Sequence, residues 1–249
     1  MITVTCISLA SQTDRRAHMT AQLQQCGLPF RFFDAIRIDP AAPPPVSYDR
    51  QRRLKHSGVP MRAGEMGCYL SHQQVWRDFL AGGEQLCLVL EDDVTVLPDF
   101  APVVQSLIEV SAQWEFVRLY GVYPRPSVAI QPLACARQLV DYLDQPNGTQ
   151  GYLINRDAAM RLLDYTARMW LAIDMSIDRD WEHGVRIMGI EPAVLSLDED
   201  FATTLGAVDK PRLSWQGKLA REYHRFGDNL RKQIWLMRKR RLLRRRGAP

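Results

Sequence analysis

The sequence has few of the features that mark a secreted, disulfide-linked or membrane-spanning protein. Its five cysteines, at positions 6, 26, 68, 87 and 135, are odd in number and form no Cys-x-x-Cys pair. This pattern argues against a disulfide framework or a zinc knuckle, and it favours reduced thiols in a cytosolic compartment. The first residues contain no basic segment followed by a long apolar one, so we expect no signal peptide. No apolar run reaches the roughly 18 residues that a transmembrane helix needs.

Two further absences narrow the kinds of site that the chain can contain. No Gly-x-Gly-x-x-Gly follows the first predicted strand, at residues 2–9, so a Rossmann dinucleotide site is disfavoured. Only five histidines are present, and none lies in a paired motif, which argues against a histidine-rich metallohydrolase. The 249 residues, 46% hydrophobic and 24% charged, fit one sizeable domain or a domain with an appendage.

The charges are distributed unevenly along the chain. Of the 32 Lys and Arg residues, 14 lie in residues 210–249, where the only acids are Glu222 and Asp228. Residues 1–209 are therefore net acidic although the whole chain carries a charge of +4. We expect two parts, an acidic globular domain at 1–209 and a basic, helical, amphipathic tail at 210–249.

One stretch combines a buried strand with a cluster of acids. Five apolar residues, Leu86 to Leu90, are followed at once by Glu91, Asp92 and Asp93. An unbroken apolar run of this kind predicts a strand buried on both faces, so the acids would lie at the carboxyl edge of a mostly parallel sheet. Adjacent carboxylates repel each other unless a cation neutralises them, and Mg²⁺ is often shared by carboxylates and substrate phosphates. The stretch indicates either a metal–diphosphate site or a strand that ends in an acidic surface turn.

The remaining segments alternate between strand and helix patterns and predict an α/β fold. The predicted strands are residues 2–9, 30–36, 114–120, 128–130, 139–143 and 189–195, and the predicted helices are 14–26, 64–80, 100–110 and 173–181, with strand, turn and helix at 148–163. The Pro-rich and basic segment 39–62 is predicted to be a loop, either a lid or disordered.

Several polar side chains fall where these elements predict a site. Arg15 and Arg16, at the start of the first helix, suit a phosphate, although a solvated helix face would look the same. On helix 64–80, His72 shares a face with a cysteine and a tryptophan, which is typical of a packed core residue, whereas the glycines allow close approach of a ligand. Asp174 and Asp178 lie at i and i+4, on one face of a short helix.

Taken together, these motifs resemble glycosyltransferase family 25, the bacterial lipopolysaccharide and lipooligosaccharide galactosyl- and glucosyltransferases. The resemblance covers about residues 2–200. It rests on blocks at residues 7–9 with 15–16, at 32–36, at 64–72 with Trp76 and at 90–94, and more weakly on 148–152 followed by Asp174. It implies a GT-A-like α/β fold, a UDP-sugar donor, a glycan or lipid-linked glycan acceptor, and transfer with inversion at the anomeric carbon.

The resemblance also implies roles for individual residues. Asp93 and then Asp92 are the expected ligands of Mn²⁺ or Mg²⁺, and Asp174, with Asp178 as the alternative, is the expected base for the acceptor hydroxyl. The expected donor-binding residues are Ser8, Arg15, Arg16, Asp34, Ser71, His72, Glu91, Asp92 and Tyr152. Among these, Ser71, His72 and Tyr152 are expected to form walls of the donor pocket, and Asp34 to accept from the uracil or the ribose.

Two other functions remain open from the residues alone. The same acids could serve a metal-dependent phosphodiester hydrolase, and the basic tail could bind nucleic acid. The tail interleaves Trp235, Leu236, Leu242 and Leu243 with seven basic residues from Arg238 to Arg246. This pattern favours a helix on an anionic membrane, at the cytoplasmic face of the inner membrane, over nucleic acid, because no aromatic stacking platform accompanies the charge.

Overall fold

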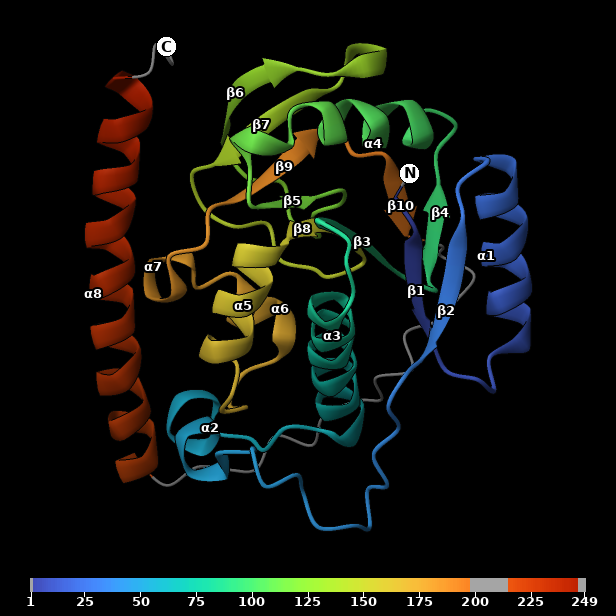
Figure 1. The fold of residues 1–249 in the computed structure, drawn as a ribbon. Coiled ribbons are helices and arrows are strands. Elements are labelled where there is room, and N and C mark those ends of the chain that lie inside the picture. The colour runs from blue at the N-terminus through green and yellow to red at the C-terminus, as the bar shows by residue number, and fades with distance from the viewer. Residues whose placement is uncertain (1, 198–214, 246–249) are drawn as a thin grey trace.

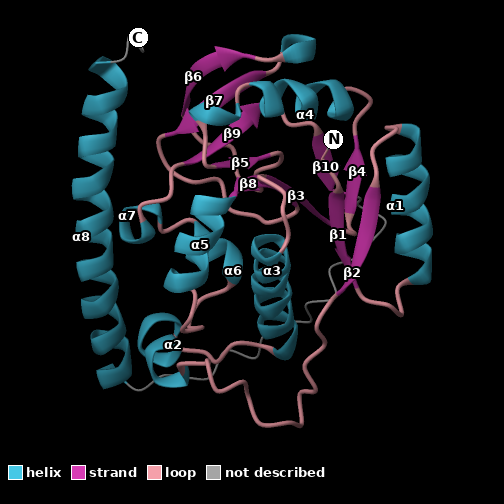
Figure 2. Cartoon of the chain, in the orientation of Figure 1, coloured by secondary structure: helices cyan, strands magenta, loops and turns pink. Residues whose placement is uncertain are grey.

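A computed structural model describes residues 2–197 and 215–245, and the side chains of residues 2–197 and 226–243. Within these residues, eight strands form one central sheet in the order β2-β1-β3-β8-β5-β9-β7-β6 (Figures 1 and 2). These strands are β1 (Val4–Ser8), β2 (Phe30–Asp34), β3 (Leu86–Glu91), β5 (Phe116–Arg118), β6 (Ser127–Pro132), β7 (Gln138–Tyr142), β8 (Gly151–Asn155) and β9 (Ile187–Glu191). A separate two-stranded sheet pairs β4 (Val94–Val96) with β10 (Leu195–Leu197).

The central sheet is mixed, but most of its strands run in one direction. β1 is parallel to both β2 and β3, and β5 is parallel to β9. β8 is antiparallel to both β3 and β5, and β7 is antiparallel to both β9 and β6. Only β8 and β7 therefore oppose the other six strands. The expected α/β class, a mostly parallel sheet flanked by helices, is confirmed.

Helices cover both faces of the sheet, and the acid-tipped strand β3 lies between them. Its residues alternate between two hydrophobic clusters, with Leu88 and Leu90 in one and Cys87 and Val89 in the other. Helices α1 (Thr13–Gln25) and α4 (Phe100–Glu109) contribute to the first cluster. Helices α3 (Ala63–Ala81) and α5 (Arg156–Tyr165) contribute to the second. Burial on both faces explains why this strand is an unbroken apolar run.

Three segments differ from the sequence expectations. The loop expected at 39–62 contains helix α2 (Arg50–Ser57), which Asp49 caps by accepting the Arg52 amide and which Gly58 ends in a left-handed conformation. The short helix at 173–181 is two helices, α6 (Ile173–Ile177) and α7 (Asp180–His183). The last strand is split between β9 and β10, because Pro192 has no amide hydrogen to continue the ladder.

The basic tail forms one long helix, α8 (Trp215–Arg245), that lies against the domain (Figure 1). It contacts α2 and α7, and Leu236 and Leu243 are buried. Lys232 pairs with Asp144 and Lys239 pairs with Asp141, each at 2.7 Å. No helix of the described chain is both long and apolar enough to cross a bilayer. The expected helix is confirmed, whereas the expected boundary at 209–210 falls outside the described residues.

Candidate active site

Most of the predicted donor-side residues meet at one edge of the sheet. Ser8 and Asp34 end the paired strands β1 and β2, and Glu91 ends the neighbouring strand β3. Because β8 is antiparallel to β3, its beginning reaches the same edge, where the Glu91 amide donates to the carbonyl of Gln150 at 2.9 Å. The edge therefore collects side chains from four neighbouring strands, which is the usual place for a ligand in an open α/β sheet.

Arg15 and Arg16 point to this edge from the start of α1. The Nη1 atom of Arg15 lies 3.0 Å from the carboxylate of Asp92. Arg16 donates from Nη2 to the Ser8 carbonyl at 2.8 Å and also pairs with Asp34, whose side chain is largely exposed. These contacts place both guanidinium groups beside the acids. They also show that Asp92 already has a cationic partner.

Asp93 differs from its neighbour because it takes part in no ion pair among the described residues. Its Oδ1 atom is buried and has no hydrogen-bond partner in the described structure. Burial, together with the charges of Glu91 and Asp92, raises the pKa of Asp93 to about 7, although Arg15 opposes the shift. A buried carboxylate oxygen with no partner, beside two further acids, has the chemistry of a hard-cation ligand.

A chain of buried hydrogen bonds fixes Glu91. The Trp76 indole N–H donates to the Tyr152 hydroxyl at 2.9 Å, and that hydroxyl lies 2.8 Å from His72 Nδ1. If the hydroxyl donates to Nδ1, the other ring nitrogen carries the proton and donates to Glu91 Oε1 at 3.2 Å. The Thr149 hydroxyl donates to the same oxygen. Burial would raise the pKa of Glu91, but the hydrogen bonds from His72 and Thr149 lower it overall.

The three side chains expected to form walls of the donor pocket are buried beneath the surface and do not line it. Ser71 and His72 are completely buried, and Tyr152 is 1% exposed. The Ser71 hydroxyl accepts from the Ile36 amide and donates to the Gly67 carbonyl, both at 2.8 Å. Gly67 itself approaches protein backbone and not a ligand, since an added Cβ would lie 2.4 Å from the Ile36 carbonyl oxygen. Ser71, His72 and Tyr152 therefore support the strand edge from inside the protein. Their direct contact with a donor stays a prediction.

The Tyr152→Phe variant should test this chain of hydrogen bonds through stability. It would leave the Trp76 indole N–H and one His72 nitrogen buried without a partner, at about 1–3 kcal/mol each. We therefore expect the free energy of unfolding, measured by urea denaturation, to fall by about 2–5 kcal/mol in total. Tyr123→Phe, at a residue that is 56% exposed, is the matched control. A loss no larger than that of the control would show that the Tyr152 hydroxyl does not bridge the two groups.

Of the two candidate bases, Asp174 lies on α6 and Asp178 lies at the C-terminal end of that helix. Both are close to Arg118. Asp178 forms an ion pair with Arg118, which ends β5 and is 1% exposed. Burial raises the pKa of Asp178 to about 7 even though Arg118 lowers it, and the charges of Asp174 and Asp180 add to the rise. Asp174 is partly exposed and accepts from the Met175 amide at 2.7 Å. Burial also raises the pKa of Asp174, and the negative charge of Glu91 at the strand edge contributes to the rise.

Arg118 and Thr149 are the residues that the sequence reasoning missed. Arg118 could have been noticed in the sequence, because it is a charged residue directly after the apolar pair Phe116 and Val117. Thr149 lies in the 148–152 block, but its role depends on the antiparallel placement of β8, which local sequence does not reveal.

A second group of potential metal ligands includes Glu91 itself. In the described part of the chain, ligand atoms of Cys68, His72 and Glu91 come within 4.8 Å of one another. Both ring nitrogens of His72 already have partners. Burial raises the pKa of the Cys68 thiol well above its usual value, so the thiol is protonated. Asp93 therefore fits a cation better than this group does.

Comparison with known proteins identifies the family. The sequence matches the model of glycosyltransferase family 25 (LPS biosynthesis protein) over residues 1–177, so the chain belongs to this family. It is 25% identical over 224 residues to the lacto-N-neotetraose biosynthesis glycosyltransferase LgtE of Neisseria meningitidis serogroup B, covering 80% of this chain and 75% of that one. It is 28% identical over 167 residues to procollagen galactosyltransferase 1-B of Xenopus laevis, covering 64% of this chain and 27% of that one.

The relatives also limit what membership shows. A protein of Homo sapiens named inactive glycosyltransferase 25 family member 3 is 32% identical over 138 residues, covering 51% of this chain and 23% of that one. The chain thus spans about a quarter of the two animal relatives and three quarters of the Neisseria protein. Because one relative is named as inactive, the residues of the site carry the argument for turnover.

Proposed function

We propose that the protein transfers a hexose, galactose or glucose, from a UDP-sugar to a lipopolysaccharide, lipooligosaccharide or related glycan, with inversion and with a divalent cation. The observation that carries the proposal is the buried Asp93 oxygen, which has no hydrogen-bond partner among the described residues, at the strand edge of a family 25 chain. Relatives whose names include lacto-N-neotetraose biosynthesis and procollagen galactosyltransferase support a glycan acceptor and a hexose donor.

The residues at the edge fit a cation-bound diphosphate. Asp93, with Asp92 beside it, would hold Mn²⁺ or Mg²⁺, which when bound supplies positive charge to the departing diphosphate. Arg15 and Arg16 are placed to donate charge-assisted hydrogen bonds to phosphate oxygens. Glu91 is fixed through Oε1, and its partly exposed carboxylate can accept from a hydroxyl of the donor ribose or sugar.

Inversion requires a base on the face of the sugar opposite the leaving group. The acceptor oxygen forms a bond to the anomeric carbon while the bond from that carbon to the diphosphate oxygen breaks, and its electron pair leaves with UDP. The proton of the acceptor hydroxyl passes to a carboxylate, which we assign to Asp174, with Asp178 as the alternative. A pKa raised by burial suits this role, because such a carboxylate takes up the proton more readily.

UDP binding tests the donor side without knowledge of the sugar. We expect UDP to raise the thermal unfolding temperature in the presence of Mn²⁺ or Mg²⁺ and to have little effect after chelation, since the diphosphate and the acids repel each other without a cation. A shift that needs no metal would contradict the assigned cation, and a shift produced only by polynucleotide would favour a nucleic-acid-binding protein.

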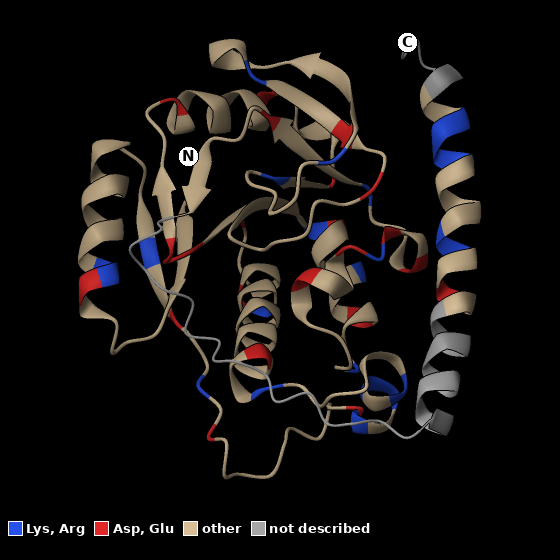
Figure 3. Ribbon diagram, turned by 180° about the vertical axis from the view of Figure 1, so that it is seen from behind, with Lys and Arg blue, Asp and Glu red and all other residues tan. Residues whose placement is uncertain are grey.

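We also propose that α8 places the enzyme on an anionic membrane surface, at the cytoplasmic face of the inner membrane. One side of the helix carries exposed Phe226, Leu230, Ile234 and Met237, spaced by four, four and three residues. Exposed Arg238, Arg240 and Arg241 follow, and Figure 3 shows basic bands on the described part of the helix. This pattern suits an interfacial helix on anionic lipid.

The structure corrects which apolar residues of the tail are available as membrane anchors. Leu236 and Leu243 are buried against the domain. Trp235 is half-buried, with Lys239 Nζ 4.8 Å from its ring centroid. Of the four expected anchors, only Leu242 is exposed. The expectation was wrong for the buried leucines because the helix uses this side to dock on the domain.

Point substitutions on the outward side test membrane binding better than removal of the helix, which would uncover the docked side. The triple variant Arg238→Gln/Arg240→Gln/Arg241→Gln should bind anionic liposomes about a hundredfold more weakly, because each surface Arg contributes about 1 kcal/mol. Pelleting with anionic and with neutral liposomes measures this. Equal pelleting of variant and wild type, or equally strong binding to neutral liposomes, would rule out electrostatic anchoring by these arginines.

A further inference from the structure

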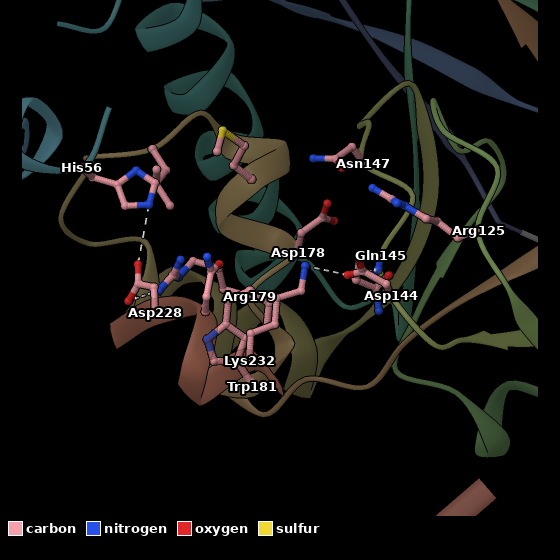
Figure 4. Close-up of a pocket in the computed structure, with 13 residues that line it drawn as sticks. His56, Arg125, Asp144, Gln145, Asn147, Asp178, Arg179, Trp181, Asp228 and Lys232 are labelled. Atoms are coloured by element: carbon pink, nitrogen blue, oxygen red, sulfur yellow. Dashed lines mark hydrogen bonds and ion pairs between the residues drawn. The ribbon is translucent and has the colours of Figure 1, made fainter. Parts of the chain in front are cut away.

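A cavity lies between the domain and α8, next to the alternative base. Its volume is about 260 Å³. Asn147 and Gln145 line it from the loop before β8, and Trp181 lines it from α7 (Figure 4). Asn229 and Lys232 contribute from α8. The C-terminal helix therefore forms one wall of a polar cavity in addition to covering the domain.

Helix α6 and its C-terminal end line the cavity and also carry the two candidate bases, Asp174 and Asp178. Asp178, which caps the C-terminal end of this helix, lines the cavity, and Met175 of the same helix also lines it. Asp174 lies one turn earlier on α6. Asn147, which lines the cavity, lies two residues before Thr149, whose hydroxyl donates to Glu91 at the strand edge. A molecule in the cavity would therefore lie beside Asp178 and close to the loop that reaches the strand edge.

Each of the three carboxylates that line the cavity is paired with a cation. Lys232 pairs with Asp144 at 2.7 Å, as the dashed line in Figure 4 shows. Arg179 pairs with Asp228 at 3.1 Å, and Asp178 pairs with Arg118. Carboxylates that are already paired, together with amide side chains, suit the hydroxyl groups of a neutral ligand. Arg125 also lines the cavity and has no ion pair among the described residues, but its side chain is exposed to solvent.

We propose that this cavity binds the acceptor sugar as a neutral glycoside, and that α8 is part of the acceptor site. This inference rests on the proposed transferase function. The amides of Asn147 and Asn229 provide donors and acceptors for sugar hydroxyls. The buried Trp181 Nε1 atom has no hydrogen-bond partner among the described residues and can donate to another hydroxyl. The volume lies just below that of the usual pocket for a drug-sized ligand, so it has room for one sugar ring, such as the terminal residue of the acceptor glycan.

Matched variants of two amide side chains on α8 test the proposal. Asn229→Ala removes an amide that faces the cavity, and Gln233→Ala removes an exposed amide of the same helix that does not line it. Asn147→Gly removes the amide on the opposite wall, and glycine accepts the positive φ of 60° at this position. UDP affinity and unfolding temperature report whether each variant keeps its fold and donor side.

The binding probes are methyl β-galactoside, methyl β-glucoside and methyl N-acetyl-β-glucosaminide, compared with galactose 1-phosphate and glucose 1-phosphate. Ligand-observed NMR in the presence of UDP and Mg²⁺ measures their affinities. At least one neutral glycoside should bind, and Asn229→Ala and Asn147→Gly should each weaken it about two- to tenfold, the value of one hydrogen bond. Gln233→Ala should bind it as the wild type does.

Three results would overturn the inference. These are binding of the sugar phosphates alone, binding of no glycoside at all, and equal glycoside binding by wild type and both cavity variants. The UDP measurement separates this failure from failure of the proposed function. If the wild type binds UDP with metal but the glycoside results are negative, only the acceptor cavity is wrong. If UDP does not bind, the transferase function itself fails.

Discussion

The Asp93→Asn variant should lose at least about a thousandfold of the proposed turnover and yet unfold at a temperature no lower than that of the wild type. Removing one charge from the cation site costs several kcal/mol of transition-state stabilisation, and each 1.4 kcal/mol is about tenfold in rate. Stability should not fall, because the buried Asp93 oxygen has no partner and two neighbouring acids repel it. Retained stability with lost activity is typical of a residue kept for function.

Asp164→Asn, at an exposed acid on α5, is the matched control and should change neither property. Circular dichroism and thermal unfolding of both variants measure the fold, and UDP release from a UDP-hexose measures turnover. An Asp93→Asn variant with a normal spectrum and more than about a tenth of wild-type turnover would exclude Asp93 as an essential cation ligand. That result would favour the simpler view that the strand only ends in an acidic turn.

The second large effect is expected for Asp174→Asn, which should lower turnover by about 10²–10⁴-fold, the usual value of a general base. The affinity for UDP with metal should change little, because the base acts on the acceptor hydroxyl. Turnover and UDP titration on the same preparation separate these effects. Equal losses in both would move Asp174 into the donor or cation site.

Asp178 needs its own control because it pairs with a buried arginine. Asp178→Asn would leave the Arg118 guanidinium without its counter-charge, and breaking such a buried pair typically costs about 3–5 kcal/mol. The double variant Arg118→Met/Asp178→Asn removes both charges and should recover much of that stability. If this double variant is folded and inactive while Asp174→Asn stays active, the base is Asp178 and not Asp174.

Local sequence was sufficient for the features that depend on local order. The run from Leu86 to Leu90 predicted a strand buried on both faces, and its alternate residues enter two different cores. The acids directly after it therefore had to lie at the sheet edge. His72 was expected to be a packed core residue because it lies between a cysteine and a tryptophan on one helix face, and it is completely buried.

Features that depend on how distant strands pair could not be predicted in this way. Whether β8 runs parallel or antiparallel to β3 decides whether Thr149 reaches Glu91 and Tyr152 reaches His72, and the local pattern of β8 is the same in either case. The same holds for α8, whose sequence shows apolar and basic residues but not which side docks. Asp141 and Asp144, which hold Lys239 and Lys232, are distant in sequence and were not signalled by any motif.

UDP release from UDP-galactose and UDP-glucose, with an acceptor glycoside and with Mn²⁺ or Mg²⁺ either present or chelated, tests the central claim most directly. The account predicts release that depends on the sugar donor, falls to background after chelation and is absent in Asp93→Asn. Release that persists undiminished in chelator and in the Asp93→Asn variant, or no release from either donor by a chain that binds UDP, would contradict it.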